Sequence, residues 1–76
     1  MELYKTKDLG EATAIVTQDI RLLRLEKAPE GFYWFIFHID KSNDTPNLYW
    51  SGELLVSAKK FNDSLKSLKD RIYANK

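Results

Sequence analysis

The segment from Phe32 to Ile39 constrains the fold more than any other part of the sequence, because it is apolar on both of its alternating sides. Successive side chains of a strand point to opposite faces of a sheet. One side carries Phe32, Trp34, Ile36 and His38, and the other carries Tyr33, Phe35, Phe37 and Ile39. Such a strand is normally central and covered on both faces, or has one face covered by a partner. The segment therefore predicts a central strand with a surplus apolar face.

A hairpin is the clearest structural prediction. Residues 20–27 are also rich in strand-forming side chains, and Ala28-Pro29-Glu30-Gly31 separates them from the aromatic strand. Proline at the second position and glycine at the fourth favour a type I turn. We expect the register to pair Lys27 with Phe32, Leu25 with Trp34, Leu23 with Ile36 and Leu22 with Phe37.

Two helices are expected to pack on this hairpin. Apolar residues at helical spacing, from Leu9 to Val16, predict a first helix near residues 7–18. Gly10 and several β-branched residues make this helix weak by itself, so packing must hold it. Ser57 is a good N-cap for a longer helix over residues 57–74, which carries one apolar stripe.

Shorter elements complete the predicted fold. We expect brief strands at residues 2–5 and 53–56, and one or two helical turns at residues 47–51 between Thr45-Pro46 and Gly52. The sequence thus predicts a small single α+β domain over residues 1–76, with an antiparallel β-hairpin-centred sheet packed by an N-terminal helix and a longer C-terminal helix. Its expected core is Leu9, Ile15, Leu22, Phe35, Phe37, Phe61, Leu65, Leu68 and Ile72.

Composition excludes several classes of protein. The 76 residues include 12 Lys and Arg against 11 Asp and Glu, a formal net charge of +1. This balance argues against a protein that coats DNA or anionic lipid. The longest apolar run, at residues 32–37, is far below the ~20 residues that span a bilayer, and the first residues lack the apolar run of a signal peptide. Because cysteine is absent, disulfides are excluded and a cytoplasmic location is expected.

No arrangement of residues indicates catalysis. His38 is the single histidine, and no cysteine accompanies it. Catalytic triads and zinc sites need a histidine supported by such partners. The three glycines stand apart, which excludes a glycine-rich phosphate loop. The sequence therefore predicts a non-enzymatic protein with no cofactor and no metal.

Aromatic and basic residues on the hairpin are the first candidates for binding. Trp34 and Phe32, with Arg21 and Lys27 on the same side of the paired strand, would suit a platform on which single-stranded nucleic acid stacks its bases. The alternatives are that Trp34 belongs to the core beneath a helix, or that it contacts another protein.

Two further groups lie outside the hairpin. Tyr49 and Trp50 would either cap the core from a loop or protrude as an anchor for a partner. Lys66 and Lys69 belong to a basic row on the last helix, which is either its solvated face or a surface for phosphates.

Four strings occur in order along the chain: YKTKDL at residues 4–9, YWFIF at 33–37, YWSGEL at 49–54 and SLKDRI at 67–72. In that order they resemble a family of short bacterial and mobile-element proteins known only as a domain of unknown function. The resemblance implies a stand-alone small protein without catalytic residues. The family pattern is commonly acidic at the position of His38, which lowers His38 as a functional candidate. A setting among phage, plasmid or defence genes would favour nucleic acid, or a protein that handles it, as the partner.

These observations favour a small binding or adaptor protein that contacts another protein, or a second copy of itself, through the surplus apolar strand face. A weak single-stranded nucleic-acid-binding protein that uses Trp34, Arg21, Arg24, Lys27 and the basic helix face is the alternative.

Overall fold

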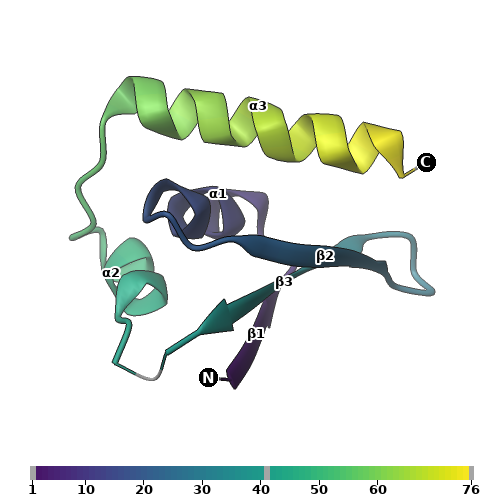
Figure 1. Cartoon of the computed structure of the whole chain (residues 1–76), viewed down its shortest axis with the longest axis horizontal. Coiled ribbons are helices and arrows are strands. Elements are labelled where there is room, and N and C mark those ends of the chain that lie inside the picture. Colours follow the sequence, from purple (N-terminus) through teal and green to yellow (C-terminus); the bar gives the residue numbers. More distant parts are fainter. Residues whose placement is uncertain (1, 41, 76) are drawn as a thin grey trace.

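The computed structural model describes residues 2–40 and 42–75 (Figure 1). Along these residues the chain forms β1 (Glu2–Thr6), α1 (Leu9–Thr17), β2 (Leu22–Lys27), β3 (Tyr33–Ile39), α2 (Thr45–Ser51) and α3 (Ala58–Ala74). The strands make one antiparallel sheet in the order β1-β3-β2. The predicted α+β fold is confirmed, and the aromatic strand is the central one.

The helices stack on one face of the sheet. α1 lies against the sheet, α3 runs along α1, and α2 packs beside α1 (Figure 1). Because α1 is enclosed in this way, most of its side chains are buried, from Glu11 to Thr17. The hydroxyls of Thr13 and Thr17 donate to the carbonyls of Leu9 and Ala14 at 2.7 and 2.6 Å, which satisfies them inside the helix.

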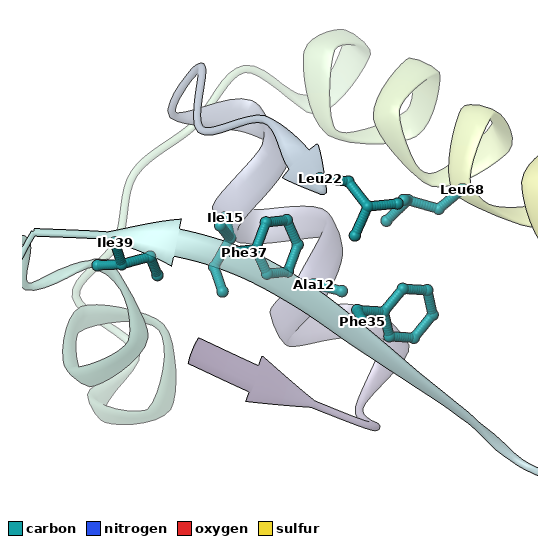
Figure 2. Packing of buried hydrophobic residues seen from close by; sticks show 7 residues of the cluster. All are labelled: Ala12, Ile15, Leu22, Phe35, Phe37, Ile39 and Leu68. Carbon is teal, nitrogen blue, oxygen red and sulfur yellow. The ribbon is translucent and has the colours of Figure 1, made fainter. Parts of the chain in front are cut away.

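The hydrophobic core lies between β3, α1 and α3 (Figure 2). Its buried members are Ala12, Ile15, Leu22, Phe35, Phe37, Ile39 and Leu68. Of the predicted core, Leu9 and Ile72 are half-buried against this cluster, and Phe61 and Leu65 are half-buried on α3. Burial of a large apolar side chain contributes about 1.5–3 kcal/mol, so this cluster is the main source of stability.

The predicted hairpin register is wrong by one residue over most of its length. Lys27 pairs with Tyr33 rather than Phe32, and Leu25 pairs with Phe35 rather than Trp34. The Gly31 amide donates to the Ala28 carbonyl at 2.9 Å, as expected for the turn, but Gly31 then adopts a φ of 105° and the Ala28 amide donates to the Phe32 carbonyl at 2.8 Å. The loop is therefore a turn followed by a left-handed glycine. Ala28, rather than Lys27, now lies opposite Phe32, which shifts the register by one residue.

A β-bulge restores the predicted pairing at the other end of the hairpin. Leu22 still lies opposite Phe37, whereas Arg24 lies opposite Ile36, so Leu23 is the extra residue. Residues three apart in a regular strand point to opposite faces. Because the bulge adds one residue, Leu22 and Leu25 both face the helices while Leu23 points into solvent.

The predicted strand at residues 53–56 is absent, and these residues form an irregular connection between α2 and α3. Gly52 ends α2 with a φ of 80°, as the sequence indicated. The amides of Glu53 and Leu54 then both donate to the Leu48 carbonyl, at 3.0 and 3.1 Å. The chain folds back over the end of α2 and cannot reach an edge of the sheet. The last helix, by contrast, begins after its predicted N-cap Ser57, whose hydroxyl accepts from the Lys60 amide at 3.2 Å.

Gly10 allows α2 to pack closely against α1. A Cβ atom at this position would overlap the Tyr49 hydroxyl and would lie 3.3 Å from the ring carbon Cζ of the same residue. Tyr49 is half-buried there, so the lack of a side chain on Gly10 makes room for the tyrosine.

We therefore expect Gly10→Ala to lower the free energy of unfolding by about 1–3 kcal/mol through overpacking, although alanine favours a helix by about 1 kcal/mol over glycine. Urea denaturation followed by circular dichroism measures the change. In a Tyr49→Phe background the overlapping hydroxyl is gone, and the same substitution should be neutral or stabilising. An equal loss in both backgrounds would show that Tyr49 does not limit the packing.

Candidate functional site

The strand register divides the sheet into two faces of different character. Phe35 and Phe37, with Leu22 of β2, point toward α1 and α3 and form the inner face. The opposite side, which we call the outer face, carries Leu3, Lys5, Arg24, Glu26, Trp34, Ile36 and His38. The helix residues of the core all pack on the inner face, and no helix of the described residues packs on the outer face (Figures 1 and 2). Among residues 2–40 and 42–75, no helix therefore covers the surplus apolar face of β3, and side chains of the sheet itself shield part of it.

Two aromatic rings at one end of the outer face form a cluster with two lysines. The rings of Phe32 and Trp34 meet edge to face, with 5.3 Å between centroids and 74° between planes. The Lys5 ammonium lies 5.0 Å from the Trp34 centroid, and the Lys7 ammonium lies 5.0 Å from the Phe32 centroid. Both distances suit cation–π attraction, which contributes about 0.5–1 kcal/mol at exposed sites. We call these four residues the aromatic–lysine cluster.

The middle of the outer face is closed by long side chains. Ile36 is only 2% exposed, although it points away from the helices. Its neighbours across the two ladders are Lys5 and Arg24, whose aliphatic stems cover it. A shallow depression of about 290 Å³ remains, lined by Leu3, Lys5, Arg24, Glu26 and Ile36.

The cations of the outer face differ in whether a carboxylate neutralises them. Arg24 and Glu26 form an ion pair at 2.8 Å. Neither Lys5 nor Lys7 forms an ion pair with a carboxylate of residues 2–40 and 42–75. The aromatic–lysine cluster therefore carries positive charge that forms no ion pair with an acidic group of the described residues.

The predicted site residues lie on several separate surfaces of the protein. Trp34 is half-buried on the outer face beside Arg24, whereas Arg21 lies exposed in the connection before β2. Lys27 pairs with Tyr33 and so belongs to the inner face, which corrects its expected place on the side of Trp34. Lys66 and Lys69 are exposed on α3, on the helix side of the sheet, so they share no surface with Trp34.

Tyr49 and Trp50 form a separate aromatic pair on α2. Their rings meet edge to face with centroids 5.0 Å apart. Tyr49 is half-buried over Gly10, as expected for a residue that caps the core, whereas Trp50 is 63% exposed. Tyr49 therefore packs against α1, and Trp50 protrudes into solvent; its role as an anchor stays a prediction.

Sequence reasoning missed Lys5 and Lys7. Lys5 reaches Trp34 only because β1 pairs with β3, which puts it opposite Ile36. The available signal was the alternation of β1, in which Leu3 and Lys5 share one side. That signal becomes useful only when the strand order is known.

A cluster of polar side chains surrounds the buried carboxylate of Glu11 on the other side of the sheet. The Tyr4 hydroxyl donates to one carboxylate oxygen, and the Thr6 hydroxyl donates to the other at 2.7 Å. Asp8 accepts from the Glu11 amide at 2.8 Å and so caps α1. Burial, and then the hydrogen bond and the charge of Glu11, raise the pKa of Tyr4 to about 12. A phenol with that pKa stays protonated near neutral pH, so its hydrogen bond to Glu11 joins β1 to α1.

Other kinds of site find no support in the described part of the chain. Its His, Asp and Glu side chains form no group of three that could hold a metal ion. None of its helices is both long and apolar enough to cross a membrane. Comparison of the chain with family models, curated proteins and solved structures gave no match.

The Tyr4 hydroxyl gives the protein a predictable response to alkali. Since its folded-state pKa is about 12 and its ordinary value is 10.0, its contribution to stability is complete below about pH 10 and disappears as the pH rises toward 12. Tyr4→Phe should therefore be less stable than the wild type near pH 9, and the gap should shrink with rising pH. The urea denaturation midpoints of the wild type and of Tyr4→Phe, measured from about pH 9 to about pH 12, test this prediction. A constant gap would mean that the phenol does not titrate this way.

Proposed function

We propose that the protein is a non-enzymatic binding module that takes its partner on the outer face of its sheet. One observation carries the proposal: β3 is aromatic on both sides, while the helices cover only its inner face. The solvated face of an antiparallel sheet is normally polar. Here Trp34 of the central strand and Phe32 just before it present two half-buried rings, and Leu3 of the neighbouring β1 is 58% exposed.

A protein partner, including a second copy of this chain, is the class that the sequence favoured. Leu3 and Trp34 would supply the apolar contacts, since exposed aromatic side chains are common anchors in protein interfaces. A single-stranded nucleic acid is the second candidate, and a different observation favours it. The ammonium groups of Lys5 and Lys7 lie over the rings, and no carboxylate of residues 2–40 and 42–75 forms an ion pair with them.

The cellular setting belongs to the same proposal. A cytoplasmic location follows from the cysteine-free composition of a small domain. A relation to the short bacterial and mobile-element proteins that the chain resembles is part of the proposal, and a setting among phage, plasmid or defence genes would favour nucleic acid, or a protein that handles it, as the partner.

A charge placed on the outer face should block either kind of partner. Leu3→Glu puts a carboxylate on the outer face, two residues along β1 from Lys5. We expect at least a tenfold loss of self-association or of oligonucleotide binding, because both apolar and anionic partners are disfavoured. Size-exclusion chromatography with light scattering, run with and without a fluorescent random oligonucleotide, measures both.

Leu55→Glu is the matched control. It makes the same substitution at a residue that is 91% exposed in the connection between α2 and α3. This variant should keep the association of the wild type. Equal losses in the two variants would contradict the assignment of the outer face.

A further inference from the structure

We infer that the outer face binds single-stranded nucleic acid, with a base stacked on Trp34 and the adjoining phosphates held by Lys5 and Lys7. This inference rests on the proposed function and names the partner class for the same face. It is drawn from the charge of the face, the limited apolar area and the placement of the cations beside the rings.

The charge of the face favours an anionic ligand. Arg24 is neutralised by Glu26 at 2.8 Å. Lys5 and Lys7 instead lie 5.0 Å from the two ring centroids, and no carboxylate of the described residues pairs with them. An anion that replaces these weak cation–π contacts gains a full ion pair at little cost.

The same charge disfavours a second copy of the chain. A two-fold symmetric interface brings the same patch of both copies together. The charges of Lys5 and Lys7 in the two copies would then approach one another, and Glu26 is the one acidic group that the described residues place on the outer face. Moreover, Ile36 is already 2% exposed beneath the neighbouring stems, which leaves little continuous apolar surface for a protein to cover.

The placement of the cations suits a nucleotide better than an acidic peptide. Trp34 lies on the central strand and Phe32 directly precedes it, and each has an ammonium group over its ring. In a single-stranded ligand a phosphate adjoins every base, so stacking on a ring brings negative charge within reach of the lysine above it. A duplex keeps its bases stacked inside, where rings on a flat sheet cannot reach them.

Fluorescence anisotropy of a labelled oligothymidylate of about 15 nucleotides tests the electrostatic part. We expect binding that weakens steeply as salt rises, since phosphate contacts release counterions. The double variant Lys5→Ala/Lys7→Ala should lower the slope of log affinity against log salt by roughly 1 to 1.5, the value for two contacts on a single strand. Lys66→Ala/Lys69→Ala removes the same charge from α3 and should leave the slope unchanged.

Trp34 is tested separately, in a Trp50→Phe background where it is the one tryptophan left. Its fluorescence should be quenched by the oligonucleotide. Trp34→Leu should weaken binding about tenfold through the loss of stacking, whereas Trp34→Tyr should retain most of the affinity. Urea midpoints of each variant show that the fold is kept, and the lysine variants give an independent readout if Trp34→Leu unfolds.

Three results would overturn the inference. The first is no binding at a salt concentration of about 50 mM, where electrostatic affinity is high. The second is an equal loss in the two double-lysine variants. The third is equal competition by an oligoglutamate peptide of matched charge, which would assign the face to acidic proteins. If Leu3→Glu still abolishes self-association in any of these cases, the binding face stands and only the nucleic-acid assignment fails.

Discussion

Phe35 and Phe37 of β3 pack against Ala12 and Ile15 of α1, and every other element is placed by this contact. In a chain of 76 residues the core is small, and a domain of this size buries only about 60% of the surface that its unfolded chain exposes. α1 is a weak helix by propensity, so it persists because the sheet and α3 enclose it. The small side chain of Ala12 lets the helix approach the rings, and Leu68 of α3 closes the cluster beside Phe35 and Leu22 (Figure 2).

The details of the hairpin follow from the same requirement. In a regular strand, Leu22 and Leu25 would point to opposite faces, and one of them would be lost to the core. The bulge at Leu23 turns both toward α1 and α3, and the three-residue loop ending at Gly31 sets the register that the bulge then adjusts. A β-bulge also bends and twists its strand. The irregular β2 is an edge strand, and such a bulge makes it a poor template for pairing with another chain.

Features with a local signal were predicted from the sequence, and those that depend on distant residues were not. The aromatic strand, the N-cap Ser57 and the end of α2 at Gly52 each follow from a few neighbouring residues, and the structure confirms them. The predicted register of the hairpin was wrong because Ala28–Gly31 suits both a four-residue turn and a turn followed by a left-handed glycine. For the candidate site, Trp34 was identified from its own strand, whereas Lys5 was missed, because its position beside Trp34 depends on β1 pairing with β3.

Long polar side chains shield the apolar outer side of the central strand from water. If β3 were bare on this side, the rings and Ile36 would form a continuous apolar surface of the kind that promotes aggregation. The stems of Lys5 and Arg24 cover Ile36, and the ammonium groups of Lys5 and Lys7 lie over the rings. These long side chains can move aside at a low energetic cost, since a cation–π contact at an exposed site contributes only about 0.5–1 kcal/mol. In the proposed complex, the residues that shield the rings from water would also attract the anionic ligand, and their displacement toward its phosphates would uncover the rings for its bases.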